Sequence, residues 1–86
     1  MQIKAYKKFR DNYDDLPKEI RKKADKQIKL LAENFRHPSL NCKKIQGRES
    51  IWEARVDFHY RMTFEIISDI IFLRSIGNHD EVIKSP

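Results

Sequence analysis

The sequence contains few of the residues that cross-link or interrupt a chain. Among its 86 residues, cysteine occurs once, glycine twice and proline three times. The single Cys42 cannot form an internal disulfide. No segment approaches the roughly 20 consecutive apolar residues of a membrane-spanning helix, and the first residues have no long apolar run typical of a signal peptide. We therefore expect a cytoplasmic protein from a reducing compartment, with no membrane segment.

The residues that are present suit one small folded domain spanning residues 1–86, since 40% are hydrophobic and 36% are charged. The charges are unevenly distributed. Residues 1–48 contain 14 Lys and Arg against 6 Asp and Glu, whereas residues 49–86 contain 4 against 7. The basic half indicates either an acidic partner, such as nucleic acid or an acidic polypeptide, or a lysine-rich surface that only keeps the protein soluble.

Apolar spacing and the few glycines and prolines predict the order of the elements. Helical spacing occurs over residues 7–15 and from Pro17 to about residue 36. Strand patterns occur over residues 2–6, 43–45, 50–57, 60–66 and 70–73, with a turn at Ser68-Asp69. A helical hairpin followed by an antiparallel meander predicts an α+β fold. The hairpin would pack on one face of a small, mainly antiparallel sheet.

Alternation along the strands predicts which side chains share a face of the sheet. Trp52, Met62 and Phe64 should pack against the helices. Arg55 and Arg61 should then lie together on the uncovered face, where two arginines repel unless something anionic lies over them. That anion is either a bound ligand or a set of carboxylates from the same strands, namely Glu53, Asp57 and Glu65.

Three residues near the end of the chain complete a candidate site: Arg74, His79 and Asp80. Histidine exchanges protons near neutral pH, and an arginine cluster stabilises charge that develops on a phosphate. The set is consistent with a phosphodiesterase site in which the 2′-hydroxyl of RNA is the nucleophile. We expect no cofactor and no metal, since the sequence has neither a phosphate-binding glycine loop nor the paired spacings of a zinc site.

Several segments in order along the chain resemble the RelE/ParE superfamily of toxins from bacterial and archaeal toxin–antitoxin pairs. They are Leu16–Ile20, His37–Leu40, Lys43–Gly47, Trp52–Asp57, Tyr60–Phe64 and Ile76–Val82. The resemblance implies two N-terminal helices on an antiparallel sheet. It also implies a type II toxin of the RelE or YafQ kind: a ribosome-dependent endoribonuclease that cuts mRNA by metal-independent attack of the 2′-hydroxyl.

The same resemblance assigns roles to individual residues. Arg61 matches the strand arginine near the scissile phosphate, and His79 matches a site histidine of YafQ-like members. We further expect Arg55 and Arg74 to help neutralise the phosphate, and His79, oriented by Asp80, to transfer a proton. Lys43, Lys44 and Arg48 would contact RNA. The implied partners are mRNA, the ribosome and a small acidic antitoxin. The toxin would be a monomer when free and would join a higher-order complex with its antitoxin.

The sequence also departs from the family pattern. Residues 81–86 contain no aromatic residue to stack on a base, and Ser75 stands where YafQ-like members have the last-strand arginine. Strict alternation would therefore turn Arg74 to the other face, unless a bulge in the strand restores it. Two alternatives therefore stay open, a ParE-like toxin that inhibits DNA gyrase and an inactive homologue that only binds antitoxin. Ile51 and Ile67 either form a partner surface or are covered by the chain's own tail.

Overall fold

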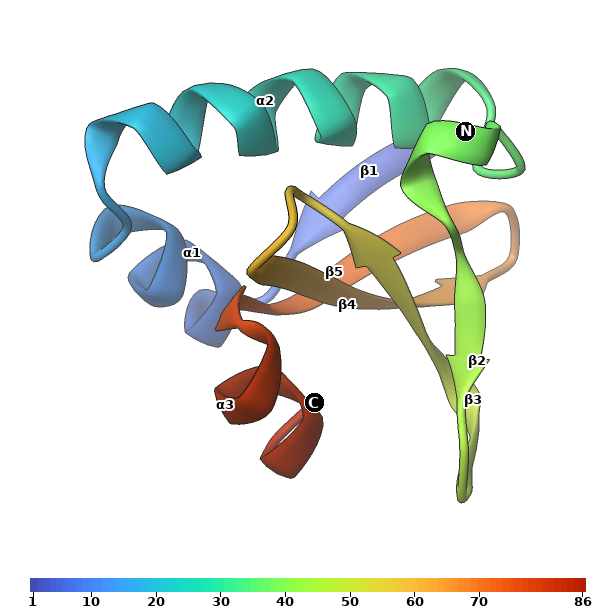
Figure 1. Cartoon of the computed structure of the whole chain (residues 1–86). Coiled ribbons are helices and arrows are strands. Elements are labelled where there is room, and N and C mark those ends of the chain that lie inside the picture. Colours follow the sequence, from blue (N-terminus) through green and yellow to red (C-terminus); the bar gives the residue numbers. More distant parts are fainter.

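The computed structural model describes residues 1–86 and contains a five-stranded sheet between two layers of helix (Figure 1). The strands are β1 (Gln2–Ala5), β2 (Lys43–Ile45), β3 (Arg48–Arg55), β4 (Tyr60–Ile67) and β5 (Ile70–Asn78). The helices are α1 (Lys7–Asp14), α2 (Lys18–Glu33), the 3-10 turn η1 (Pro38–Leu40) and α3 (His79–Lys84). Helix α2 covers one face of the sheet, α1 lies beside β5, and α3 lies against the other face, which confirms the predicted α+β class.

The helical hairpin forms as its sequence pattern predicts. Pro17 precedes the first residue of α2, where its missing N–H leaves no intrahelical bond unmade. The apolar stripe of the hairpin is buried at Phe9, Leu16, Ala24 and Leu31. Helix α2 ends at Glu33, slightly before the predicted position, because Asn34 takes an extended backbone conformation. None of the helices combines the length and hydropathy that a bilayer crossing requires.

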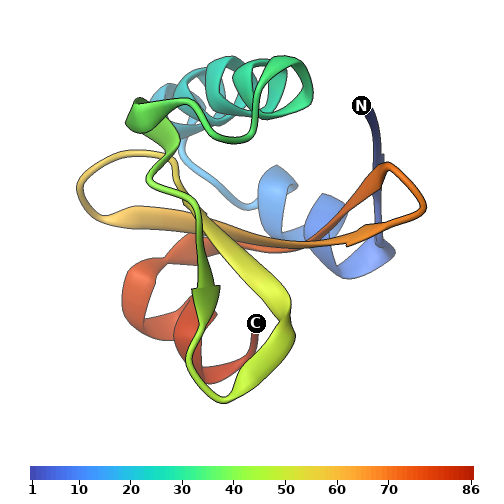
Figure 2. The same ribbon diagram turned by 90° about the vertical axis from the view of Figure 1, so that its right-hand side faces the viewer.

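The strand order is β1-β5-β4-β3-β2, so the last long strand lies in the interior of the sheet (Figure 2). Strand β1 pairs with β5 in parallel, and every other pair is antiparallel. The turn between β4 and β5 is the predicted Ser68-Asp69. Both residues have positive φ values, 48° and 65°, which suit the tight turns that connect twisted antiparallel strands.

Strand β5 contains an irregularity that the sequence did not reveal. Phe64 of β4 pairs with Leu73, but the neighbouring Thr63 pairs with Ser75, so Arg74 is an extra residue in β5. Such a bulge disturbs the strict alternation of side chains. Arg74 therefore reaches Glu65 on the same face of the sheet as Ser75. The bulge therefore restores Arg74 to the face from which strict alternation alone would turn it, which was the outcome that the sequence left open.

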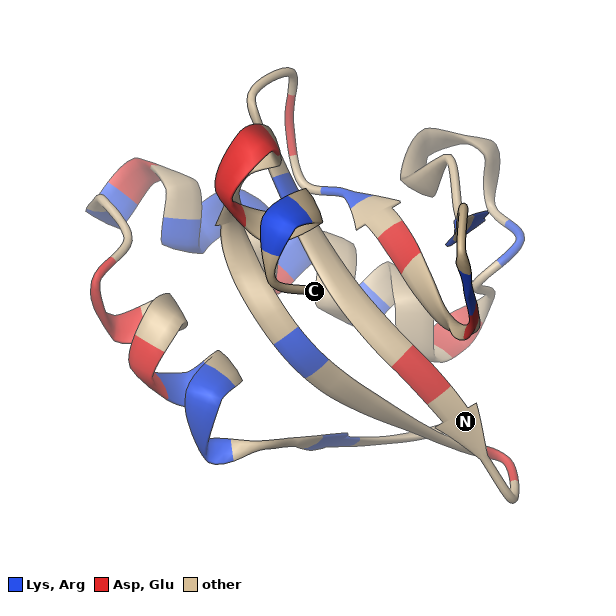
Figure 3. Cartoon of the chain, turned by 90° about the horizontal axis from the view of Figure 1, so that it is seen from below, with Lys and Arg blue, Asp and Glu red and all other residues tan.

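The face of the sheet that carries the arginines is only partly open, which corrects the expectation of an uncovered surface. Helix α3 and the residues after it lie across it (Figure 3), and Val82 is 3% exposed. Thr63 and Ser75 are buried beneath the tail, and the Thr63 hydroxyl donates a hydrogen bond to the Pro86 carbonyl oxygen at 2.7 Å. Ile51 is buried on this face, whereas Ile67 remains 47% exposed.

Candidate functional site

Arg55 and Arg61 occupy directly opposed positions on β3 and β4, as alternation predicts. Both side chains are half-buried. Opposed residues in antiparallel strands have Cβ atoms about 5 Å apart. Positive charges on two such neighbouring side chains repel each other unless an anion lies near both.

The carboxylates that sequence analysis offered as that anion all have other partners. Three ion pairs use them: Lys43 with Glu53 at 3.6 Å, Lys23 with Asp57 at 3.3 Å, and Arg74 with Glu65 at 3.1 Å. Neither Arg55 nor Arg61 forms an ion pair with any carboxylate of the chain. The arginine pair is therefore available for an anion from outside.

The backbone of the β3–β4 turn fixes the guanidinium of Arg61. Its Nη1 donates to the carbonyl oxygens of Asp57 at 2.6 Å and Tyr60 at 3.0 Å, with a longer contact to Phe58 at 3.4 Å. The Nε and Nη2 atoms of Arg61 form no hydrogen bond within the protein. One edge of the guanidinium thus sets its orientation and the rest remains free to bind a ligand.

The turn is itself ordered by Asp57. Its Oδ1 accepts hydrogen bonds from the backbone N–H groups of His59 and Tyr60, each at 2.9 Å, and its Oδ2 accepts from Lys23 Nζ on α2. Partial burial of Asp57 raises the pKa of its carboxyl. The two backbone hydrogen bonds and Lys23 outweigh that effect, so the pKa lies below its ordinary value. The carboxylate is therefore charged at neutral pH and stabilises the turn.

His79 lies beside this turn because of the bulge in β5. Beyond the bulge Tyr60 pairs with Asn78, and the backbone N–H of His79 donates to the carbonyl oxygen of His59 at 2.9 Å. Both histidines and Arg61 line one hollow of about 290 Å³. The structure thus brings together the predicted Arg61 and His79, and it adds His59. His59 was not among the predicted site residues, because its position beside His79 depends on the register beyond the bulge.

Asp80 lies near His79 but is poorly placed to orient it. The Oδ1 atom of Asp80 is 3.5 Å from Nδ1 of His79, and the Asp80 side chain is 87% exposed. A contact this long, in water, fixes the imidazole ring weakly. The backbone N–H of Asp80 is bound instead by the side chain of Asn78, which caps the start of α3.

Arg74 shares the face of Arg61 but is engaged elsewhere. Its Nη1 contacts Glu65 at 3.1 Å, its Nε donates to the Pro86 carbonyl oxygen at 3.3 Å, and its guanidinium lies 5.9 Å from the centre of the Tyr6 ring. The Tyr6 hydroxyl in turn donates to Glu65 at 2.6 Å, a hydrogen bond that raises the pKa of Tyr6. Arg74 thus ties the tail and the residue before α1 to the sheet, and it does not line the hollow of Arg61 and His79.

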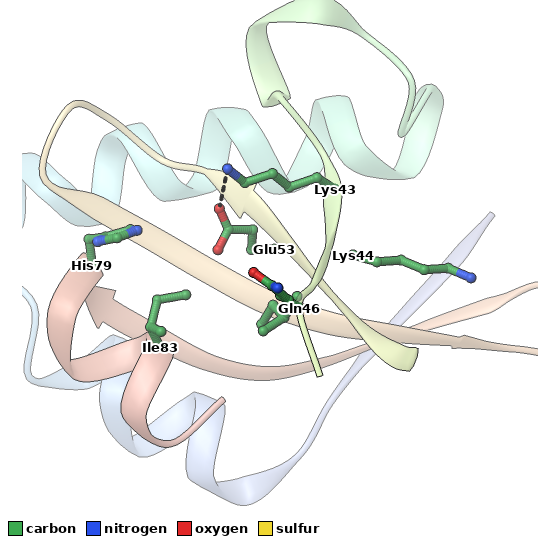
Figure 4. Close-up of a pocket in the computed structure, with 7 residues that line it drawn as sticks. Lys43, Lys44, Gln46, Glu53, His79 and Ile83 are labelled. Carbon is green, nitrogen blue, oxygen red and sulfur yellow. Dashed lines mark ion pairs between the residues drawn. The ribbon is translucent and has the colours of Figure 1, made fainter. Parts of the chain in front are cut away.

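A second hollow, of about 570 Å³, lies between β2 and α3 and also includes His79 (Figure 4). Lys43 extends into it toward Glu53. The side chain of Lys44 points the other way, and its Nζ lies 5.5 Å from the centre of the Trp52 ring. Arg48 is exposed at the start of β3 and lines neither hollow. Of the three predicted RNA contacts, only Lys43 therefore extends toward the histidine.

Solved structures that superpose on this chain include toxins and toxin–antitoxin complexes. YafQ from Escherichia coli superposes with a TM-score of 0.79 at 14% identity, over 94% of this chain and 96% of YafQ. The RelB–RelE antitoxin–toxin complex of Methanococcus jannaschii contains a chain with a TM-score of 0.77 at 22% identity, over 96% and 99% of the two chains. The YoeB/ParE toxin of Agrobacterium tumefaciens gives 0.78 at 12% identity, over 92% and 99%.

These likenesses show that the chain has the fold of the RelE/ParE toxins, as the resemblance in sequence implied. The likeness extends over nearly the full length of each chain. No protein-family model matches the sequence, and no curated protein sequence matches it.

Proposed function

We propose that this protein is the toxin of a type II toxin–antitoxin pair and acts as a ribosome-dependent mRNA endoribonuclease. The observation that supports this most directly is the opposed pair Arg55 and Arg61, which has no carboxylate partner and adjoins two histidines. A phosphodiester is an anion of suitable size for such a pair. The fold, which is that of RelE and YafQ, agrees with the proposal.

The chemistry needs a group that removes a proton and a group that supplies one. The 2′-oxygen of a ribose attacks the adjacent phosphorus, and the bond to the 5′-oxygen of the next nucleotide breaks. The products are a 2′,3′-cyclic phosphate and a 5′-hydroxyl. Arg61 and Arg55 stabilise the extra negative charge on the phosphorus oxygens in the transition state. His79 and His59 exchange the two protons, since an imidazole can both accept and donate a proton.

The proposed partners follow from the charge distribution. Exposed lysines along α2, together with Lys43, would bind phosphates of mRNA and of ribosomal RNA, so binding should weaken steeply with salt. A small acidic antitoxin would bind the same basic surfaces. Structures of this fold have been solved with antitoxins, in the RelB–RelE and DinJ–YafQ complexes. We propose a monomer when free and a higher-order complex with the antitoxin.

The test is induced expression in a bacterial host with mapping of mRNA 5′ ends by primer extension. Wild type should cut within translated codons. Arg61→Ala and His79→Ala should each lower the cutting rate about 100- to 1,000-fold, the usual cost of removing one transition-state contact. Arg61→Lys should also be impaired, because an ammonium cannot reproduce the planar hydrogen bonds of a guanidinium.

Arg36→Ala is the matched control, since Arg36 is exposed just beyond the end of α2 and lines neither hollow. Circular dichroism should show the same fold for all variants. Equal cutting by wild type and Arg61→Ala would contradict the assignment of Arg61.

A second candidate is a ParE-like toxin that inhibits DNA gyrase. It is favoured by the sequence of residues 81–86, which contains no aromatic residue. In the same experiment, growth arrest with a DNA-damage response and no mRNA cuts would support this candidate. The absence of any growth arrest would support the third alternative, an inactive homologue that retains antitoxin binding.

A further inference from the structure

Phe58 is the most exposed large hydrophobic side chain of the protein. It lies in the turn between β3 and β4 and is 73% exposed. The ring of His59 meets it edge to face at 4.9 Å, and the guanidinium of Arg55 lies over it, 6.0 Å from the ring centre. An exposed ring adds little to the core, and this one lies beside the arginine pair, where its surface is open to contact with a ligand.

The turn holds Phe58 in a defined place relative to the arginines. Asp57 accepts the two backbone hydrogen bonds that close the turn, and Arg61 Nη1 contacts the Phe58 carbonyl oxygen at 3.4 Å. Phe58 also lines the same hollow as Arg61 and His79, in which it is the only hydrophobic residue. The hydrogen-bonded turn thus presents one aromatic surface next to a polar hollow that contains Arg61.

We propose that Phe58 stacks on a nucleobase of single-stranded RNA whose phosphate is bound by Arg55 and Arg61. The inference rests on the proposed function for the identity of the phosphate. Bases that flank a bound phosphate in single-stranded RNA are unstacked, and proteins bind them on aromatic side chains. Stacking makes no hydrogen bond to the base edge. The site therefore accepts every base, with some preference for the larger purines.

A nucleotide fits this surface better than an apolar partner protein does. An apolar side chain packed on Phe58 would also remove water from Arg55 and Arg61, which have no counter-charge in the protein, and such desolvation is costly. A nucleotide supplies a base for the ring and an anion for the guanidinium groups together. Phe58 is also isolated, with no other exposed large hydrophobic residue in the hollow.

The test is a titration with a single-stranded tetranucleotide in which one base is 2-aminopurine and every sugar is 2′-deoxyribose, so that the nucleophile is absent. The fluorescence of 2-aminopurine decreases when it stacks. Phe58→Ala and Phe58→Leu should weaken binding about 10- to 100-fold, as expected for the loss of one stacked base. Phe58→Trp, which keeps a flat ring, should bind within about threefold of wild type.

Ile67→Ala is the control, since Ile67 is an exposed hydrophobic residue in β4 next to the other turn. Its binding should equal that of wild type. Unchanged binding in Phe58→Ala would overturn the inference, and so would a Phe58→Trp variant as weak as Phe58→Leu. A wild-type protein that does not bind the probe would also overturn it. Loss of antitoxin binding in Phe58→Ala with an unchanged titration would assign the ring to a protein partner instead.

The titration and the mapping of mRNA ends separate the two proposals. If the protein binds the probe and quenches its fluorescence but cuts no mRNA, the result supports the stacking site and contradicts the proposed nuclease activity. If the Phe58→Ala variant cuts mRNA as fast as wild type, the result supports the proposed nuclease activity and contradicts the stacking site.

Discussion

Replacing Asp57 with alanine removes the hydrogen bonds that order the β3–β4 turn, and its cost follows from the contacts. The carboxylate accepts two backbone N–H groups at 2.9 Å and Lys23 at 3.3 Å. The turn is exposed, so water rebinds both N–H groups after substitution, and their loss should cost about 1–2 kcal/mol, as for a helix cap. The half-exposed Lys23 pair adds about 0–1 kcal/mol. We expect a total of about 2 kcal/mol.

A loss of that size is easily measured in a small domain. For a chain of this length it lowers the melting temperature by roughly 8–16 °C, and urea denaturation should give the same free energy. Asp57→Asn keeps an oxygen acceptor for the turn and should lose less than half as much. Asp14→Ala is the control, because Asp14 is exposed and its carboxylate accepts no hydrogen bond, and it should change stability by no more than about 0.5 kcal/mol.

The contribution of Asp57 should also depend on pH. Because the pKa of its carboxyl is lower in the folded protein than the ordinary value of 3.8, the stabilisation is complete above about that pH. It is lost as the pH falls through the lower, folded value. The difference between wild type and Asp57→Ala should therefore be constant from pH 7 to about pH 5 and shrink progressively below about pH 4. An equal difference at pH 6 and pH 3 would refute the role given to the carboxylate.

Two further predictions concern side chains outside the arginine pair. Burial raises the pKa of the Cys42 thiol to about 11. Iodoacetamide at pH 8 should therefore alkylate the native protein at least about 100-fold more slowly than the urea-unfolded chain. Equally rapid labelling of both would contradict the buried environment of the thiol. Thr63→Val removes the hydroxyl that donates to Pro86 at 2.7 Å and contacts Ser75 at 2.6 Å. It should cost about 1–3 kcal/mol in urea denaturation, whereas Thr63→Ser should cost less because it keeps the hydroxyl.

The elements with strong periodicity could be predicted from the sequence. Both N-terminal helices, the β4–β5 turn and the alternation that opposes Arg55 to Arg61 all agree with the structure. These features depend on contacts close in sequence or on a regular repeat of two or 3.6 residues. They are also the features that place the arginine pair.

The end of the chain could not be predicted in the same way. Helix α3 is short and buries only Val82, so no apolar repeat marks it. Residues 74–78 of β5 contain one arginine, one serine, one glycine and one asparagine but only one apolar residue. The sequence pattern therefore did not predict the second half of the strand. Both segments are stabilised by the rest of the fold. The Pro86 carbonyl oxygen, for example, accepts from Thr63 and Arg74 on two different strands.

The extra residue in β5 determines the composition of the candidate site. Between the β4–β5 turn and the bulge, Phe64 pairs with Leu73, and an uninterrupted ladder in that register would bring Asn78 opposite His59. With Arg74 inserted, every later pair moves by one position, and His79 comes to lie beside His59. The same insertion turns Arg74 toward Glu65 and the tail. One inserted residue thus brings His79 beside His59. Its mark in the sequence is the three-residue step from Leu73 to Ile76, both of which are buried, where strict alternation would give a step of two.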